Sequence, residues 1–130
     1  MERQRLYIDG TWMEGTDKKT FPSINPATGE RLAEVCEAAP QDVAAAFQAA
    51  KKSFYETREW RDMDVQQRSD IILKIADGLA ARRDELARVE TMDMGKPLRE
   101  SECDVDDAIH CFRYYAGLIR TPEGGCHEVN

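Results

Sequence analysis

The sequence of 130 residues lacks several features that mark common protein classes. Its eight glycines never form the GxGxxG pattern of a dinucleotide-binding turn, and no phosphate-binding loop is present. No apolar run reaches transmembrane length, and the opening MERQRLYIDG lacks the apolar core of a signal peptide. The net charge of −7 argues against a nucleic-acid surface, which needs clustered Lys and Arg. These absences predict a cytoplasmic protein with neither nucleic-acid nor membrane partners.

The cysteines also form no CxxC pair, which argues against a redox or zinc motif of that kind. The four are Cys36, Cys103, Cys111 and Cys126. In a cytoplasmic chain we expect reduced thiols rather than a disulfide framework. Cys103, Asp107 and His110 share a helical face, and Cys126-His127 could add zinc ligands. This spacing matches no structural zinc pattern, so the alternative is a mixture of surface and packing residues.

The first third of the chain is predicted to be extended. Residues 6–12 read as a β-hairpin, because Asp9-Gly10 can adopt the positive φ angles of a tight turn. Residues 21–24 and 30–36 are predicted strands, separated by a turn that contains proline and glycine. The strands are too few and too closely spaced for alternation with helices. We therefore expect no parallel sheet from this chain alone.

Four amphipathic helices are predicted after the strands. They cover residues 40–55, a segment that begins after Asp64, residues 84–94, and a segment from about Ser101 to Leu118. Asp64 is the expected N-cap of the second helix, and Gly95 with Pro97 ends the third. The first helix is expected to bury a stripe of apolar residues. These are Val43, Phe47, Ala50 and Phe54.

The last helix has an apolar side and an acidic side. Steps of three and four residues place Val105, Ile109, Phe112, Ala116 and Ile119 on one buried face. Asp104 and Asp107 are i, i+3 neighbours on another side, so their carboxylates can converge. Two interpretations stay open: acids that stabilise the start of a helix, or a site for an organic cation. Asp106 turns elsewhere and is interpreted as solvated.

Asp93 lies on the apolar side of the third helix, near Leu86 and Val89. A carboxylate in an apolar setting needs a partner, because an unpaired buried charge is costly. The partner is either a capping or backbone hydrogen bond, or a bound cation. The sequence alone does not decide between these interpretations.

Several segments resemble the aldehyde dehydrogenase superfamily. ETMDMGKP at residues 90–97 is similar to the "ET-x-D-x-GKP" segment of this family, and DVDDAIHCFRYYAGL at residues 104–118 to the "FRYYAG" helix. The segments YIDG-x-W and INPATGE resemble the entry hairpin of the family. The resemblance is closest to the betaine aldehyde and aminoaldehyde dehydrogenase branch. It covers nearly all of this chain but only the front of the family sequence.

The resemblance implies an α/β family fold, in which residues 1–130 form an incomplete N-terminal part. It implies oxidation of an aldehyde, betaine aldehyde or an aminoaldehyde, to the carboxylate by an oligomeric enzyme. NAD or NADP would be bound mainly by segments beyond residue 130. Homo-oligomerisation and a small cationic aldehyde are the expected partners. The rival hypothesis is a non-catalytic helical module that acts in assembly or partner binding.

The resemblance also assigns residues. In the aminoaldehyde branch, acids that match Asp104 and Asp107 face the amino or ammonium end of the substrate. In betaine aldehyde dehydrogenases, residues that match Ser23, Ile24 and Asp93 hold potassium, which prefers such oxygen ligands. The Gly-Gln-Cys, Pro-Trp-Asn and Glu-Leu-Gly-Gly segments of the family mechanism do not occur here. No catalytic residue is therefore assigned, and the chain alone is expected to be inactive.

Overall fold

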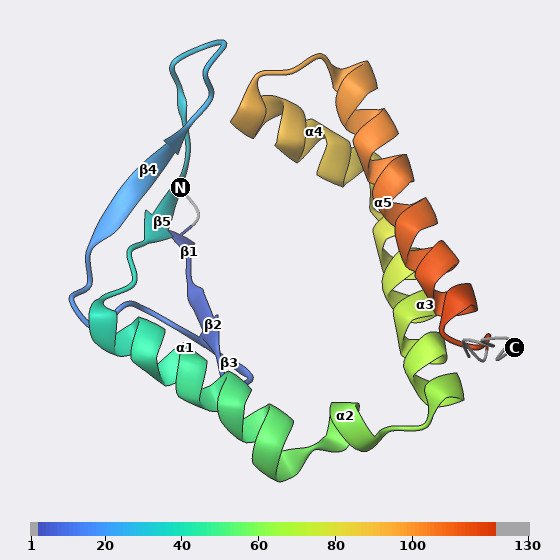
Figure 1. Cartoon of the computed structure of the whole chain (residues 1–130). Helices are drawn as coiled ribbons and strands as arrows, with labels where there is room; N and C mark the ends of the chain where they lie inside the picture. Colours follow the sequence, from blue (N-terminus) through green and yellow to red (C-terminus); the bar gives the residue numbers. More distant parts are fainter. Residues whose placement is uncertain (1–2, 122–130) are drawn as a thin grey trace, which may run out of the picture.

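The computed structural model describes residues 3–121, in which short strands precede a series of helices (Figure 1). The strands are β1 (Arg3–Gln4), β2 (Leu6–Ile8), β3 (Thr11–Met13), β4 (Thr20–Ile24) and β5 (Arg31–Cys36). The helices are α1 (Pro40–Lys52), the π-helical turn η1 (Ser53–Thr57), α2 (Glu59–Asp62), α3 (Val65–Ala81), α4 (Arg83–Met94) and α5 (Leu98–Leu118). Within residues 3–121, no helix is long and apolar enough to cross a membrane. The predicted order of strands followed by helices is confirmed.

The strands form two small sheets. β2 and β3 make the predicted hairpin, in which Asp9 and Gly10 have φ angles of 49° and 78°. β5 pairs antiparallel with β4, and the register shifts between Ser23 and Ile24. β1 lies on the other edge of β5 and runs parallel to it. No parallel sheet was expected, and the sheet of β1, β5 and β4 is mixed; its parallel pairing involves the two-residue strand β1, which is too short to show any periodicity.

The boundary between α4 and α5 is set by Gly95 and Pro97. Gly95 ends α4 in the left-handed conformation, with φ 80°. Pro97 then adopts φ −59° and ψ 140° as the N-cap, so α5 begins at Leu98 rather than near Ser101. Asp104 and Asp107 consequently lie inside the helix, beyond its first turn. The helix-dipole interpretation loses support, since that effect falls off within the first turn.

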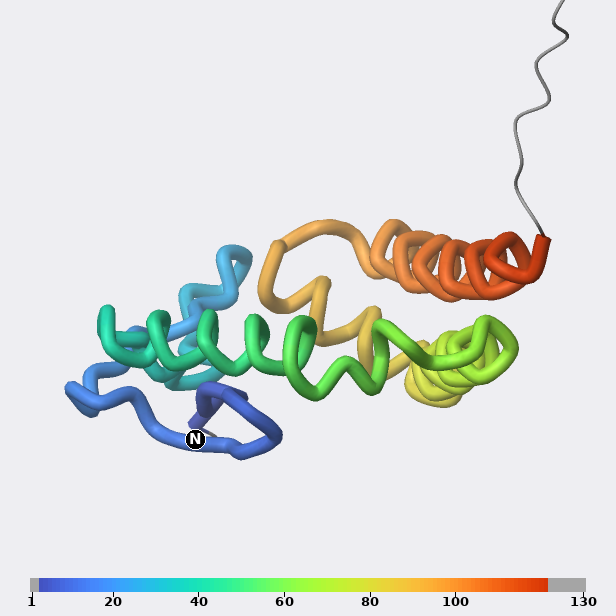
Figure 2. Tube along the Cα trace, turned by 60° about the horizontal axis from the view of Figure 1, so that its bottom comes forward, coloured from blue at the N-terminus to red at the C-terminus, as the bar shows by residue number. Residues whose placement is uncertain are grey.

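The core lies among α3, α4 and α5. Its buried members are Ala76, Ala87, Val105 and Ile109, with Leu79 and Leu86 packed against them. Figure 2 shows α3 and α5 running side by side. The hydroxyl of buried Ser69 donates to the carbonyl of Ala116 at 2.7 Å, and Arg120 Nε donates to that hydroxyl at 2.6 Å. The predicted inward face of α5 is confirmed at Val105, Ile109 and Ala116, whereas Phe112 is partly exposed.

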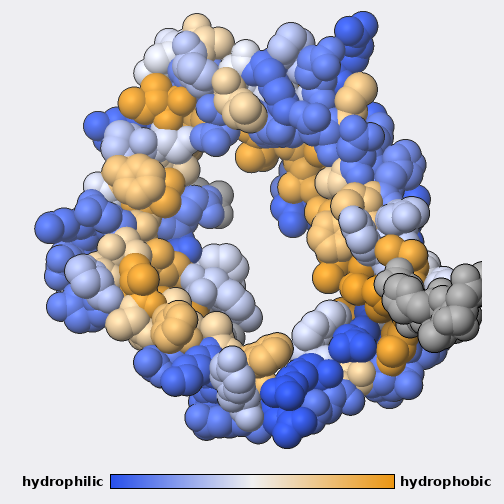
Figure 3. Space-filling view, viewed as in Figure 1, coloured by the Kyte–Doolittle hydropathy of each residue, from blue (hydrophilic) through white to orange (hydrophobic). Residues whose placement is uncertain are grey.

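The apolar stripe expected to be buried on α1 is exposed instead. Val43, Phe47 and Phe54 are 59%, 66% and 52% exposed. Ala46, Ala49 and Ala50 of α1 line an open pocket beside the β2–β3 hairpin, so Ala50 is the member of the predicted stripe that lies on the hairpin side. Periodicity identified a shared face, but the hairpin packs against the alanine side. Figure 3 shows an opening through the molecule between this β-rich part and the long helices, with apolar side chains gathered on the α3–α5 side.

The N-terminus of α1 is tied to the loop after β3 by one carboxylate. Asp42 is only 4% exposed and accepts hydrogen bonds from Thr16 Oγ1 at 2.6 Å, Thr16 N at 2.9 Å and Ala39 N at 2.8 Å. The Thr16 hydroxyl, followed by the two backbone amides, lowers the pKa of Asp42 below its ordinary value. Its stabilising effect is therefore present above the unfolded pKa and lost as the pH falls through the folded pKa.

Replacing Asp42 with asparagine should lower the melting temperature by several degrees near neutral pH. Asparagine has one acceptor oxygen and no charge, so it cannot accept all three hydrogen bonds. The difference from the wild type should shrink as the pH falls below about 4, the ordinary pKa of an aspartate, because the unfolded chain then binds the proton before the folded protein does. Circular dichroism melts across this range measure it, with exposed Asp17→Asn as the control. A difference that does not change with pH would contradict this account.

Candidate functional site

The acidic side of α5 carries the residues predicted to receive a cationic substrate. Asp104 and Asp107 stand one turn apart and are both exposed, whereas Val105 and Ile109 point into the core. The side chain of Asp104 is 53% exposed. Both carboxylates therefore remain accessible while the apolar face of the helix is buried. This arrangement provides two negative charges on one exposed strip of helix.

Lys96 joins this acidic strip, which the sequence interpretation missed. Its ammonium group forms ion pairs with Asp104 of α5 and with Glu90 of α4. Asp107 has no ion pair within residues 3–121. The sequence shows Lys96 only as the middle residue of a helix-ending GKP segment. Lys96 precedes Asp104 by only eight residues, and this short separation was the available signal for an ion pair. Predicting that pair also required the relative orientation of α4 and α5, which the sequence does not give.

The interpretation of Asp106 as a solvated residue was wrong. Arg83, at the start of α4, donates Nε to Asp106 Oδ1 and Nη2 to Asp106 Oδ2, both at 2.7 Å. These two hydrogen bonds hold the pKa of Asp106 below its ordinary value and raise the pKa of Arg83. The pair links α4 directly to α5, whereas Asp104 is linked to α4 only through Lys96 and Asp107 forms no ion pair among residues 3–121.

The second predicted site lies where β4 meets α4. Ser23 Oγ donates to Asp93 Oδ1 at 2.6 Å, so the structure brings these two predicted residues together. Both line a pocket of about 300 Å³. Its other lining residues are Gln4, Leu32, Ala33, Val89 and Met92. Asp93 therefore has a hydroxyl partner, which satisfies one of its two oxygens and leaves the other available.

Ile24 lies next to Ser23 but does not line this pocket. The register of β4 and β5 shifts between these two residues, which alters the direction of backbone carbonyls there. A hydroxyl, a carboxylate and backbone carbonyls are the oxygen donors that hard cations take. The oxygen donors of Ser23 and Asp93 thus fit a potassium ion. Ile24 lies beside the register shift of β4, but nothing else in its position indicates a role in binding the ion.

A close backbone contact holds the same two segments together. A Cβ atom on Gly95 would lie 2.6 Å from Cγ of Pro26, and the φ of Gly95 is positive. Both conditions require glycine at this position. The NPATG turn after β4 and the GKP segment after α4 therefore meet directly. The sequence interpretation treated these motifs as two separate chain reversals.

The zinc alternative gains no support from the described part of the chain. No group of three or more His, Cys, Asp or Glu side chains between residues 3 and 121 could hold a metal ion. Cys103, Asp107 and His110 are all exposed on α5. Cys126 and His127 lie outside the described residues. Cys36 is a buried free thiol, and Cys103 and Cys111 are exposed free thiols.

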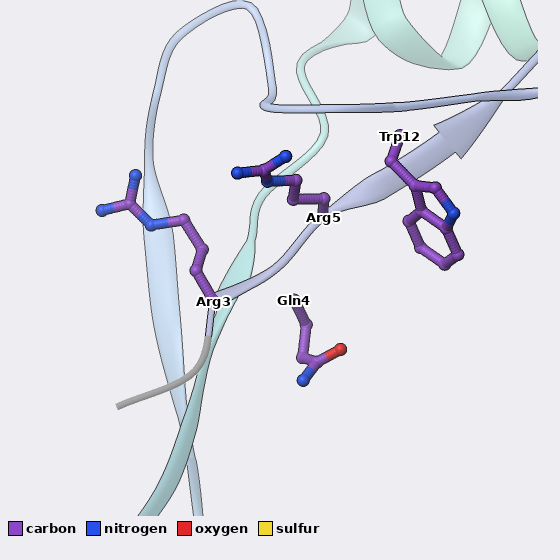
Figure 4. A pocket seen from close by; sticks show the side chains of 4 residues that line it. All are labelled: Arg3, Gln4, Arg5 and Trp12. Atoms are coloured by element: carbon purple, nitrogen blue, oxygen red, sulfur yellow. The ribbon is translucent and has the colours of Figure 1, made fainter.

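A further open pocket, also of about 300 Å³, lies near β1. It is lined by Arg3, Gln4, Arg5 and Trp12 (Figure 4). The close-up shows Arg3 and Arg5 on one side of the chain and Gln4 on the other. Arg3 also pairs with Glu14 at 2.8 Å. These side chains do not converge on a common point, so we assign no ligand here.

Comparison of the sequence with known proteins identifies the family of this chain. The sequence pattern of the Aldehyde dehydrogenase family matches residues 12–129. Mitochondrial aldehyde dehydrogenase of Mesocricetus auratus is 40% identical over 114 residues, which are 87% of this chain and 23% of that protein. The chain belongs to the aldehyde dehydrogenase family. It spans about a quarter of the length of these relatives.

Solved structures agree and define the branch more closely. Apo betaine aldehyde dehydrogenase of Staphylococcus aureus matches 97% of this chain and 25% of its own, at a TM-score of 0.90 and 39% identity. The same enzyme in complex with NAD+ matches 88% of this chain and 23% of its own, at a TM-score of 0.86 and 42% identity. Aldehyde dehydrogenase of Bacillus cereus matches 99% of this chain and 26% of its own chain, at a TM-score of 0.88 and 35% identity. The predicted resemblance to the betaine aldehyde branch is confirmed.

Proposed function

We propose that this chain is the N-terminal part of an NAD-dependent dehydrogenase that oxidises a small cationic aldehyde to its carboxylate. Betaine aldehyde or an aminoaldehyde is the proposed substrate. The observation that carries the proposal is the pair of exposed acids, Asp104 and Asp107, one turn apart on α5. Similarity to betaine aldehyde dehydrogenase, whose structures include complexes with NAD+, supports both the substrate class and the cofactor.

The charge of the α5 strip supports this substrate class on physical grounds. Carboxylates beside a substrate path attract an ammonium or trimethylammonium group and raise its local concentration. They repel an aldehyde that carries its own carboxylate, because like charges placed close together are unfavourable. A neutral aliphatic aldehyde is nearly indifferent to them. The strip therefore acts on binding and selection, away from the carbon that reacts.

The nucleophile, the oxyanion donors, the base and most of the NAD contacts are proposed to come from sequence beyond residue 130. Asp104 and Asp107 would bind the cationic end of the substrate. Ser23 and Asp93 would hold a potassium ion that joins β4 to α4, with the carbonyl of Ile24 as a further ligand. We also propose a cytoplasmic homo-oligomer for the full-length enzyme. These assignments give the described segment a role in recognition and stability rather than in bond breaking.

The 130-residue chain alone should form no NADH from betaine aldehyde, whereas the full-length enzyme should form it readily. The chain has no Gly-Gln-Cys, Pro-Trp-Asn or Glu-Leu-Gly-Gly segment to carry out the chemistry. Absorbance of NADH measures the reaction, with NADP tested in parallel and heat-killed protein as the control. NADH formation by the purified chain above this control would overturn the assignment of the chemistry to other segments.

Replacing Asp93 with asparagine should abolish any extra thermal stability that potassium gives the full-length enzyme over sodium. The change removes the one carboxylate of the proposed site but keeps the size of the side chain. Melting temperatures at equal concentrations of the two chlorides measure the effect. Asp77→Asn on the exposed side of α3 is the matched control. Equal melting temperatures in both salts for wild type and variant would leave Asp93 with only its hydrogen bond to Ser23.

A further inference from the structure

We propose that Lys96 sets the strength of the preference for cationic aldehydes, by holding Asp104 in an ion pair and leaving Asp107 as the main acceptor of the substrate cation. This inference rests on the proposed function and deepens it. It assigns unequal roles to two acids that the sequence treats alike. It also means that a basic residue sets how strongly this site binds the substrate cation.

The position of Lys96 is fixed by the backbone on both sides. Gly95 before it is left-handed and lies against Pro26, and Pro97 after it is the N-cap of α5. The Lys96 side chain is only 21% exposed, and its ammonium group lies between Glu90 and Asp104. A short, constrained connection and two carboxylate partners keep this ammonium group on the acidic strip.

The charges explain why the two acids differ. Glu90, Lys96 and Asp104 together carry one positive and two negative charges, so the Coulomb attraction of Asp104 for another cation is partly cancelled. Lys96 also occupies the place beside Asp104 that a substrate ammonium group would take. A substrate must displace a partly shielded ion pair to reach Asp104. Asp107, exposed and without an ion pair among the described residues, has no such competitor.

Lys96→Met in the full-length enzyme is the direct test. Methionine keeps an unbranched apolar stem but removes the charge. The KM for betaine aldehyde should fall about fivefold, because Asp104 becomes free to attract the substrate. The KM for the neutral isostere, in which a tert-butyl group replaces the trimethylammonium group, should not change, and kcat should stay the same for both. Lys96→Arg keeps the charge and should behave as the wild type.

Single substitutions of the acids test the unequal roles. In the wild-type background, Asp107→Asn should raise the KM for betaine aldehyde more than Asp104→Asn does. In the Lys96→Met background, Asp104→Asn should remove the gain in affinity. A purely structural role for Lys96 predicts instead a lower melting temperature and equal changes for both aldehydes.

The inference is overturned if Lys96→Met melts like the wild type and leaves the KM for betaine aldehyde unchanged. It is also overturned if, in the wild-type background, Asp104→Asn raises the KM for betaine aldehyde more than Asp107→Asn does. This comparison does not depend on Lys96→Met, so it tests the inference even if that variant does not fold. Failure of the proposed function looks different: the wild type would oxidise neither aldehyde. In that case calorimetric binding of choline, a trimethylammonium probe that carries no aldehyde, to the same variants decides the role of Lys96.

Discussion

Replacing both Asp104 and Asp107 with asparagine should raise the KM of the full-length enzyme for betaine aldehyde by about tenfold or more. Each partly desolvated contact between a carboxylate and an ammonium group is worth about 1 kcal/mol. The double substitution removes both charges from the exposed strip of α5 but preserves side-chain size. The KM for the neutral tert-butyl isostere should hardly change. The kcat should change little for either aldehyde, because the proposed role of these acids is in binding the cationic end of the substrate and not in the chemical step.

Asp106→Asn is the matched control for this experiment. It lies on the same helix and makes the same change of charge, but its carboxylate is held by Arg83 through two hydrogen bonds of 2.7 Å. Loss of this ion pair should lower the melting temperature. The ratio of the KM for betaine aldehyde to the KM for the tert-butyl isostere should stay close to that of the wild type. An equal loss on cationic and neutral aldehydes in the double variant would show that Asp104 and Asp107 only stabilise the helix.

Ile109→Ala should reduce the stability of the helical core by about 2–5 kcal/mol, the usual cost of a large-to-small change at a buried site. Ile109 is 5% exposed and packs with Ala76, Ala87 and Val105 where α3, α4 and α5 meet. The two alanine neighbours are too short to fill the space, which leaves only Leu79 and Leu86 at the edge of the cluster to move toward it. The cavity should therefore persist, and the cost should lie in the upper part of the range.

Hydrogen exchange of the α5 amides in the full-length enzyme measures this loss as a free energy of local opening. Ile75→Ala is the matched control, since the same side chain on α3 is 43% exposed. That substitution should cost less than about 1 kcal/mol. Similar losses for Ile75→Ala and Ile109→Ala would mean that the core does not lie at the junction of α3, α4 and α5.

Local chemistry made some of the fold predictable from the sequence. The hairpin of β2 and β3 follows from Asp9-Gly10, whose φ angles of 49° and 78° match the turn that this dipeptide favours. The inward face of α5 follows from the spacing of Val105, Ile109 and Ala116, all of them buried. In these cases the signal lies within a few residues, so no knowledge of distant partners is needed.

Packing between distant segments was not predictable in the same way. Periodicity shows that Val43 and Phe47 share a face of α1, but not that the hairpin lies along the neighbouring, alanine-rich side instead. The pairing of Arg83 with Asp106 joins residues 23 apart in the chain, and its discovery requires the angle between α4 and α5. The same holds for Lys96, whose contact with Asp104 depends on where α5 begins.

Asp93 is an intermediate case. The sequence placed Asp93 on an apolar face and predicted a capping or backbone hydrogen bond or a cation as its partner. In the structure Asp93 is exposed and accepts a hydrogen bond from the hydroxyl of Ser23, 70 residues earlier in the chain. The resemblance to aldehyde dehydrogenases pointed to both Ser23 and Asp93, whereas the residue pattern alone indicated only that Asp93 needs a partner. A family resemblance thus carries long-range information that composition and spacing do not contain.

The preference of the wild-type, full-length enzyme between betaine aldehyde and its neutral tert-butyl isostere tests the central claim most directly. The two aldehydes have nearly the same size and shape, so their kcat/KM ratio isolates the effect of the positive charge. An acidic strip formed by Asp104 and Asp107 predicts that kcat/KM with NAD is higher for betaine aldehyde by about tenfold or more. Equal values, or a preference for the neutral aldehyde, would contradict the assignment of this segment to recognition of a cationic substrate.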